Sequence, residues 1–328
     1  MKKLLGKAVL SAVLVSALPQ VAQARVLNPS PAQTQPPAST FEAGHLPFSI
    51  TLRDELEVNL DTFAVFAHPG ETIRIRSDKA LSWVEGDTSR PAATELDWTA
   101  PATPGLTQVR LEDENGHAMQ LNLLVMHAHT PEDGEAINGY RLGNYPAEPY
   151  LGHANYRAPE NFLEVSDGMA DLAVSPHFRL GQFLCKQPTD GAPYLVLSER
   201  LLVKLEGILE AANERGWRAD TFTVMSGYRT PAYNAGLGNG RHSRHIYGGA
   251  ADIFIDSDGD GVMDDLNGDG VHDRQDAAAL FDLVDSLSHN SPAFTPLIGG
   301  LGEYAPTSNH GPFVHVDERG WRARWGRS

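Results

Sequence analysis

The chain has 328 residues, with 26 Lys and Arg against 42 Asp and Glu, which gives a formal net charge of −16. This excess of acidic residues argues against a nucleic-acid partner or an anionic membrane surface, because both bind positively charged protein surfaces. The single cysteine, Cys185, excludes an internal disulfide and a thiolate zinc cluster. A zinc ion would need histidine and carboxylate ligands here. The length predicts about two domains, with three as the alternative.

The first residues of the chain are typical of an export signal. Residues 1–24 combine a basic start, an apolar run ending at Leu18 and a small-x-small cleavage site ending at Ala24. The run is too short for a comfortable membrane span, and no later stretch reaches about 18 apolar residues. We therefore predict a periplasmic or secreted protein with no integral membrane segment after cleavage. Residues 25–40, rich in Pro, Ser, Gln and Ala, predict a flexible linker.

Residues 41–129 show a hydrophobic period of two. Apolar residues alternate with polar ones in four runs: Leu56, Val58 and Leu60; Ile73 and Ile75; Val109 and Leu111; and Met119, Leu121, Leu123 and Val125. Turn signals separate the runs, and Asn115-Gly116 predicts a hairpin between the last two. This pattern predicts a small all-β domain, an Ig-like sandwich, without chemistry of its own. We interpret His127 and His129 as surface residues.

Residues 130–170 are a Gly-, Pro- and Tyr-rich connector, and a second domain over 171–328 follows. Its helical periodicities predict a helix that begins after Ser198 and ends at Gly216, and a second helix over 277–287. Short apolar runs at 222–225, 250–255 and 313–316 predict strands. The second domain is therefore expected to be an α+β domain with a small antiparallel sheet.

Three residues of the second domain have the character of metal ligands: His245, Asp252 and His315. Two imidazoles and a carboxylate, with a fourth position for water, are a known composition for catalytic zinc. Such an ion lowers the pKa of its water to about 7 and polarises a carbonyl group. Three other histidines compete as ligands: His177, His242 and His272. Of these, His242 is interpreted as a spectator, because the flanking glycines favour a loop.

Four segments resemble the M15 zinc peptidases, which include D-alanyl-D-alanine carboxypeptidases and other peptidoglycan peptidases. Residues 243–252, SRHIYGGAAD, resemble the S-x-H-x-x-G-x-A-x-D motif, and 313–317, FVHVD, resemble the closing H-V-D strand. Residues 226–231, SGYRTP, and the segment from 175 to 183 resemble two further family segments. The four occur in family order over 175–325. The resemblance implies His245, Asp252 and His315 as zinc ligands.

The resemblance also implies roles for other residues. Arg229 would hold the substrate carboxylate or carbonyl group, for which a planar guanidinium is suited. Some family members use a glutamate three residues before the last ligand as general base, but Pro312 stands there. His310 resembles the histidine used near that point by carboxypeptidase-like members and is the predicted proton shuttle. Asp317 is expected to orient a ligand histidine, and Ser243 to hold the ligand loop or touch substrate.

An acidic insert at 256–276 contains eight Asp and one Arg. Its second half places oxygen-bearing side chains at calcium-loop positions 1, 3, 5, 9 and 12 with glycine at 6, and resembles the loop of dockerin repeats. We predict one or two structural Ca²⁺ ions in addition to Zn²⁺, and a solvated acidic loop is the alternative. The predicted ligands are Asp256, Asp258, Asp260, Asp264, Asp265, Asn267, Asp269, Asp273 and Asp276.

The leading hypothesis is a secreted zinc metallopeptidase that hydrolyses peptidoglycan stem peptides as a D,D-carboxypeptidase or endopeptidase. A non-catalytic, metal-stabilised cell-wall binding module on the same scaffold is the alternative, because the glutamate base is missing. The sequence leaves the bond that is cut and the role of the N-terminal domain open.

Overall fold

The structure is a computed structural model that describes residues 41–327. The predicted signal peptide and linker lie outside the described residues. Within that range the chain is rich in strands, has three α-helices and belongs to one compact unit. None of the described helices is both long enough and apolar enough to cross a membrane. The larger of two hydrophobic core clusters in the described residues runs from Phe48 to Val316, so the two predicted domains share it and their boundary stays a prediction.

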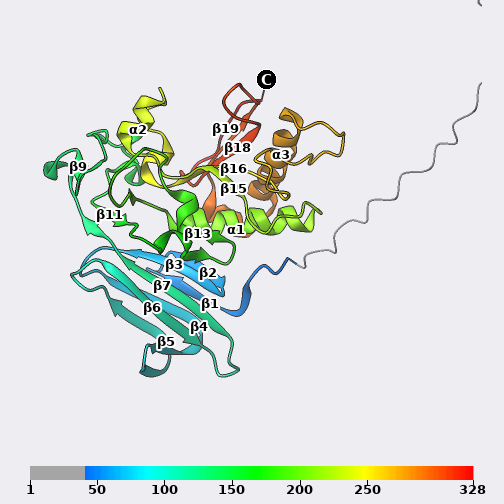
Figure 1. Ribbon diagram of the computed structural model, residues 1–328. Coiled ribbons are helices and arrows are strands. Elements are labelled where there is room, and N and C mark those ends of the chain that lie inside the picture. The colour runs from blue at the N-terminus through cyan, green and yellow to red at the C-terminus, as the bar shows by residue number, and fades with distance from the viewer. Residues whose placement is uncertain (1–40, 328) are drawn as a thin grey trace, which may run out of the picture. The chain divides into compact units, whose positions relative to one another are not determined.

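The N-terminal part is a seven-stranded sheet, blue to teal in Figure 1. The strands follow the order β2-β1-β4-β6-β7-β3, and β5 pairs with β4. Their bounds are β1 His45–Leu52, β2 Leu56–Leu60, β3 Thr62–Ala67, β4 Thr72–Glu85, β5 Thr88–Thr99, β6 Gly105–Glu112 and β7 Ala118–Val125.

All four predicted alternating runs are strands whose apolar residues are buried. The hairpin at Asn115-Gly116 joins β6 to β7, which pair antiparallel. An Ig-like sandwich is not confirmed, because all seven strands belong to one hydrogen-bonded sheet in which β3 runs parallel to β7. The prediction missed β1, β3 and β5; in β3 the residues from Phe63 to Ala67 are all buried and therefore show no alternation.

The buried outer face of β3 is explained by its packing against the C-terminal part, where it contacts strand β12 (Ala173–Ser175) and helix α1 (Glu199–Glu214). A polar clamp fixes this contact. The guanidinium group of Arg53 donates to the Glu199 carboxylate at 2.8 Å and to Glu71 at 2.7 Å, and Glu199 also accepts from the backbone N–H of Phe66. The N-terminal sheet is thus tied to the first turn of α1.

The predicted connector contains small sheets and short 3-10 helices in place of long periodic elements. The strands within 130–170 are β9 Ala136–Ile137, β10 Tyr140–Arg141 and β11 Asn161–Glu164, and three short strands lie on either side of it: β8 His127–Ala128, β13 Phe178–Arg179 and β14 Tyr194–Leu195. The 3-10 helices of the described chain are η1 Pro131–Asp133, η2 Tyr150–Gly152, η3 Ala154–Tyr156, η4 Met169–Asp171, η5 Leu180–Phe183, η6 Arg244–Tyr247 and η7 Pro292–Leu297.

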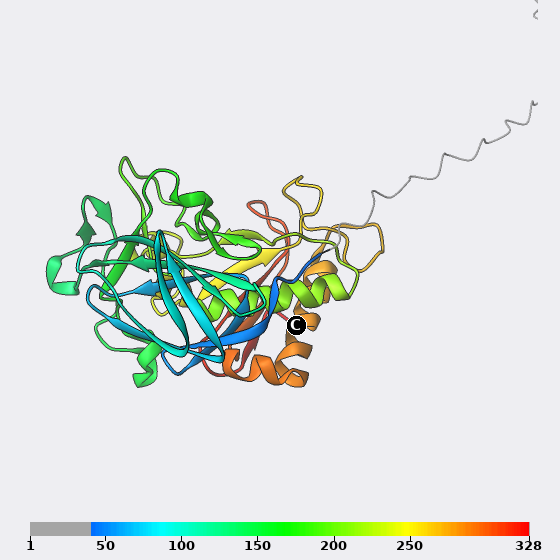
Figure 2. The same cartoon turned by 90° about the horizontal axis from the view of Figure 1, so that it is seen from below.

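A five-stranded sheet of order β15-β16-β18-β17-β19 forms the centre of the C-terminal part. Its bounds are β15 Thr223–Ser226, β16 Ala250–Phe254, β17 Gly300–Tyr304, β18 Phe313–Asp317 and β19 Ala323–Trp325. Helix α2 spans Pro231–Gly236, and α3 spans Arg274–Asn290. Helix α3 packs on β17, β18 and α1 (Figure 2). The predicted mixture of helices and a small sheet is confirmed, but the sheet is not wholly antiparallel, because β19 runs parallel to β17. Helix α2 and strands β17 and β19 were not predicted.

Candidate metal centre

Strand register assembles a row of residues across the five-stranded sheet. Asp252 on β16 lies directly opposite His315 on β18, and Ser226 on β15 lies opposite Asp252 on its other side. On the far side of His315 the row continues to Gly302 on β17 and Trp325 on β19. Residues directly opposite each other in neighbouring strands share one face of a sheet. The register therefore brings Asp252 and His315 together although 63 positions separate them.

The third member of the cluster, His245, reaches this row from η6. The helix ends at Gly248, which has a φ of 65° and lies against the backbone of Val196. A side chain at position 248 would be strained by that conformation and would collide with the Val196 carbonyl group. The glycine thus lets the chain turn within a few residues from the loop ligand His245 into strand β16, which carries Asp252.

Hydrogen bonds behind the cluster fix the tautomers of both histidines. His245 donates from Nδ1 to the carbonyl oxygen of Gly227 at 2.7 Å, so its Nε2 carries the lone pair. His315 donates from Nε2 to Asp317 Oδ2 at 3.1 Å, so its Nδ1 carries the lone pair. These two nitrogens lie 3.1 Å from each other, and 3.2 Å and 2.9 Å from Asp252 Oδ1.

The cluster fits a zinc ion. With both imidazoles neutral, three acceptor atoms face one another and no donor lies between them, an arrangement that a cation stabilises. Their separations of 2.9 to 3.2 Å approach the roughly 3.3 Å expected between ligands of a tetrahedral zinc ion. The three side chains are buried. Two nitrogens and one oxygen are a donor set that zinc accepts, and they leave a coordination position open.

The buried surroundings also set the charges of the cluster. Burial lowers the pKa of His245, which favours the neutral, ligating form of the ring. Burial alone would raise the pKa of Asp252, but when the facing nitrogens of His245 and His315 are protonated, their charges and hydrogen bonds hold this pKa well below its usual range. Asp252 is therefore a carboxylate at neutral pH, as a metal ligand has to be.

Arg229 lies beside the cluster. Its guanidinium group forms an ion pair with Asp252 Oδ2, the carboxylate oxygen that does not face the histidines, and its Nε donates to Ser226 Oγ at 2.7 Å. Within residues 41–327, its Nη1 makes no hydrogen bond or ion pair. The side chain of Arg229 is 12 % exposed. Arg229 thus orients Asp252 and keeps one N–H edge for a further acceptor.

Asp317 lies where the sequence predicts an orienting residue. It is fully buried, and besides His315 it accepts from the backbone N–H of Gly300 at 2.7 Å and from the Arg319 side chain. Burial raises its pKa, but the hydrogen bonds from His315 and Arg319 outweigh this and hold the pKa well below its usual range. An anionic Asp317 fixes the His315 ring and raises the basicity of its ligating nitrogen.

The structure does not bring His310 or Ser243 into contact with the cluster. His310 lies in the loop between β17 and β18, where its Nδ1 bonds to the carbonyl oxygen of Gly311 and its ring contacts Phe313. Ser243 precedes η6, and its side chain makes no capping hydrogen bond. Both roles stay predictions.

The other histidines lie outside the cluster. His177 pairs with Glu206 at 2.7 Å, His242 accepts from Arg241, and His272 bonds to the carbonyl oxygen of Met263. His127 lies 3.3 Å from Glu164, whereas His129 is buried, so the surface interpretation is wrong for His129. It is buried because its backbone pairs with the connector and its ring contacts Phe162.

The acidic insert folds into two loops with the same hydrogen-bond pattern. Asp256 accepts from the N–H groups four and five residues later, and Asp265 does the same. In the first loop Asp256, Asp258 and Asp260 lie close enough to share a metal ion, and they are mostly exposed. In the second loop Asp273 caps helix α3, and Asp276 is fully buried and accepts from backbone N–H groups, including that of Leu266. The residue at position 12 of this loop therefore supports its backbone.

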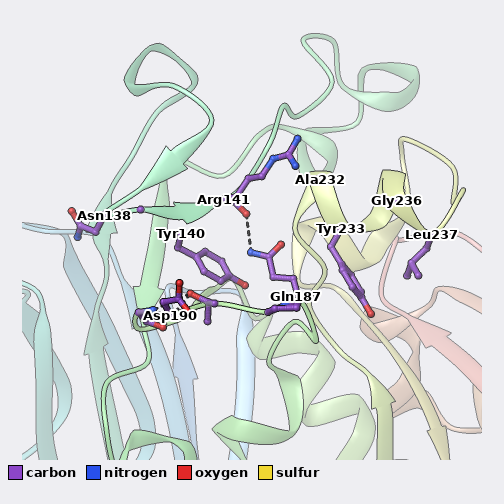
Figure 3. Close-up of a pocket in the computed structure, with 13 residues that line it drawn as sticks. Asn138, Tyr140, Arg141, Gln187, Asp190, Ala232, Tyr233, Gly236 and Leu237 are labelled. Atoms are coloured by element: carbon purple, nitrogen blue, oxygen red, sulfur yellow. Dashed lines mark hydrogen bonds between the residues drawn. The ribbon is translucent and has the colours of Figure 1, made fainter.

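A separate pocket of about 840 Å³ lies beside the β9–β10 hairpin and α2. Figure 3 shows Arg141, whose carbonyl oxygen accepts from Gln187 at 2.9 Å, above the ring of Tyr140. None of its lining residues belongs to the predicted site. It is linked to the metal centre through Thr230, the neighbour of Arg229, whose hydroxyl group donates to Gln187.

A buried His-Asp-His set with an open position is the type of centre that hydrolytic metalloenzymes use. The family model described as Peptidase M15 matches residues 177–263, which supports a likeness to M15 peptidases in this segment. His245 and Asp252 lie inside the match, and His315 lies beyond its end. The predicted resemblance to M15 peptidases is confirmed for the segments within 177–263, and the segment at 313–317 lies outside the match.

The other comparisons do not identify a further family for this chain. No curated protein matches the chain. One similar solved structure is the Bacteroides ovatus mixed-linkage glucan utilization locus SGBP-B in complex with a mixed-linkage heptasaccharide, at 10 % identity and a TM-score of 0.14. The similarity covers 26 % of this chain and 32 % of that one, so this chain spans about a third of its length.

Proposed function

We propose that this protein is a secreted zinc peptidase that hydrolyses peptidoglycan stem peptides, as a D,D-carboxypeptidase or an endopeptidase. The observation that carries the proposal is the convergence of His245, Asp252 and His315 in a segment that begins within an M15 match. When bound, a zinc ion supplies a Lewis acid that lowers the pKa of a water molecule to about 7 and polarises the scissile carbonyl group.

The chain's own residues position the substrate. In the proposal, Arg229 offers the N–H groups of Nη1 to a carboxylate or carbonyl oxygen of the peptide, while Ser226 and Asp252 hold its other edge. Asp317 keeps the His315 ring in place throughout. Ser243 would hold the ligand loop or touch the substrate.

His310 is the proposed proton shuttle, which takes a proton from the attacking water and returns it to the leaving amine. Its side-chain hydrogen bond goes only to the neighbouring residue Gly311, and the loop around it is exposed. Such a loop can bring the ring toward the cluster when substrate binds, and hydrogen bonds of this kind often tighten only in the substrate complex.

The acidic insert is proposed to bind one or two Ca²⁺ ions that brace it. The first loop, with Asp256, Asp258 and Asp260, supports this proposal best because its three carboxylates can reach one ion. Hard oxygen ligands on a loop with glycine at the sixth position suit calcium. The ion would be structural.

The proposal is tested by digesting purified peptidoglycan and identifying the released peptides by mass. We expect release that stops on chelation, returns with zinc, and is abolished by His310→Ala with zinc still bound. Release of single D-alanine residues would indicate a carboxypeptidase, and release of cross-linked fragments an endopeptidase. A fully active His310→Ala variant would contradict the assignment of the base. Binding without any cleavage by the zinc-loaded protein would favour the non-catalytic module.

A further inference from the structure

We propose that Trp325, held by Tyr304, forms the wall of a specificity subsite on the side of the metal centre opposite Arg229. It would receive the apolar side chain of the peptide residue next to the scissile bond. This inference rests on the proposed function and names a feature of its substrate.

The row across the sheet gives the subsite its place. Arg229 is bonded to Ser226 at one end of the row, Asp252 and His315 lie in the middle, and Trp325 stands at the other end. Neighbouring strands are about 4.8 Å apart, so the five positions of the row span roughly 19 Å. That length accommodates several residues of an extended peptide lying across the strands, with its scissile bond at the centre.

Gly302 explains how the Trp325 ring comes close to the metal ligand. A Cβ atom at position 302 would collide with Nε1 and the neighbouring carbons of the Trp325 indole, so the ring occupies the space that a side chain on β17 would fill. The indole therefore leans toward His315, and the two ring centroids are 5.1 Å apart. Trp325 is half-buried. One part of the indole thus supports the cluster, and another part faces solvent.

Tyr304 fixes the orientation of this wall. Its hydroxyl oxygen accepts from Trp325 Nε1 at 3.0 Å, and its own ring stacks on Phe313 with centroids 4.4 Å apart. Because the indole N–H is already bonded, Trp325 presents carbon surface to an incoming group. Tyr304 as a whole is 37 % exposed and extends that surface. The Arg319 guanidinium carbon lies 5.3 Å from the Trp325 ring centroid. This contact further restricts the orientation of the indole.

The two ends of the row therefore differ in chemistry. The Arg229 end attracts an anionic or carbonyl oxygen, whereas the Trp325 end offers rings that bury apolar surface. This polarity fixes the direction of the peptide: its carboxylate side points to Arg229, and the residue on the other side of the scissile bond packs on Trp325. A side chain that fills the subsite should improve binding, and glycine should not.

The experiment uses the zinc-loaded protein and the peptides acetyl-L-Lys-X-D-Ala, where X is glycine, D-Ala or D-Leu. We expect the wild type to prefer D-Leu and D-Ala over glycine in KM. In Trp325→Ala the KM for the D-Leu peptide should rise about 10-fold and the preference should vanish, because one apolar contact is worth roughly that factor. Gly302→Ala, which displaces the indole, should act in the same direction. Trp98→Phe, an indole-to-phenyl change in the N-terminal sheet, is the matched control. It should leave the KM values for the three peptides unchanged.

Two further readouts separate this proposal from a supporting role of Trp325. Zinc affinity, measured by competition with a chromophoric chelator, should stay within about twofold in Trp325→Phe, because the indole is not a ligand. Peptide binding should quench tryptophan fluorescence in the wild type and not in Trp325→Phe. A large loss of zinc affinity, or an unchanged preference in Trp325→Ala, would overturn the subsite. If the wild type binds these peptides with quenching but cleaves none, the proposed function fails and the subsite stands; absence of any binding refutes both.

Discussion

The buried cluster and the acidic insert bring candidate ligands together in opposite ways. His245, Asp252 and His315 come from a loop and two strands, and up to 70 positions separate them. The carboxylates of the insert follow one another within residues 256–276 and accept hydrogen bonds from backbone N–H groups of the same insert, up to ten residues away. The first arrangement depends on strand register, and the second on local sequence.

The two groups of candidate ligands also differ in how firmly the surrounding residues fix their side chains. In the cluster, each histidine is locked by a partner behind it, Gly227 or Asp317, and solvent is excluded. In the insert, the side chains of Asp258 and Asp260 face solvent, so water solvates their charges when no cation does. We therefore expect changes in the cluster to have large effects on metal binding and activity, and changes in the insert to have small effects on stability.

The largest expected effect is that of Asp252→Asn. The amide keeps the shape of the side chain but loses the charge that faces both histidines and Arg229. We expect zinc affinity and peptide cleavage to fall by at least about 100-fold, because losing outer partners alone costs about 10- to 100-fold. Metal content by mass spectrometry and cleavage assays measure this. Asp258→Asn, in the insert, is the matched control and should keep one zinc ion per chain. Equal zinc content in both variants would contradict the assignment of the zinc site to the buried cluster.

A smaller effect is expected for Asp317→Asn. The residue touches His315 without being a proposed ligand, and its substitution weakens the hydrogen bond that fixes the ring. Zinc affinity should fall by about 10-fold, with cleavage restored at high zinc concentration. Titration of the apo-protein with zinc measures the change. Wild-type affinity would mean that burial alone fixes the ring of His315.

Calcium should affect stability more than activity. If the first loop binds Ca²⁺, an ion concentration 100 times the dissociation constant stabilises the fold by about 2.7 kcal/mol and raises the melting temperature. The double variant Asp256→Asn, Asp258→Asn should lose this shift and retain its zinc. Thermal unfolding with and without a calcium-selective chelator is the measurement. An identical calcium shift in wild type and variant would place the ion elsewhere.

The smallest effect is expected for the His177–Glu206 pair. It lies outside both the cluster and the insert, so its substitution gives a reference for the size of an ordinary stability effect. Burial lowers the pKa of His177, but the hydrogen bond and charge of Glu206 outweigh it and leave the pKa raised. The pair therefore stabilises the fold fully below the unfolded pKa near 6.5, and this contribution is lost as pH rises through the folded pKa. His177→Gln should cost about 1 kcal/mol at pH 5.5 and less at pH 9 in urea unfolding. A difference that grows with pH would contradict the sign.

Much of the fold could be read from periodicity. Helix α1 begins after Ser198, as predicted, and the alternating runs of the N-terminal part are strands. The Ser198 side chain, however, makes no capping bond. Strands β3, β17 and β19 were missed because they are short or buried on both faces, which removes the alternation that the prediction uses. Trp325 was also missed, since its contact with His315 depends on the parallel pairing of β19 with β17.

The sequence by itself determined the residue types of the metal centre, their order along the chain and the hydrogen-bonded loops of the insert, because these follow from side-chain chemistry and from contacts within a few residues. Only the tertiary structure decided which nitrogen of each histidine faces Asp252, that Arg229 holds the same carboxylate, and that an indole ends the row. Strand register and burial set these features. Both depend on packing between segments that lie far apart in the chain, which a pattern of neighbouring residues does not encode.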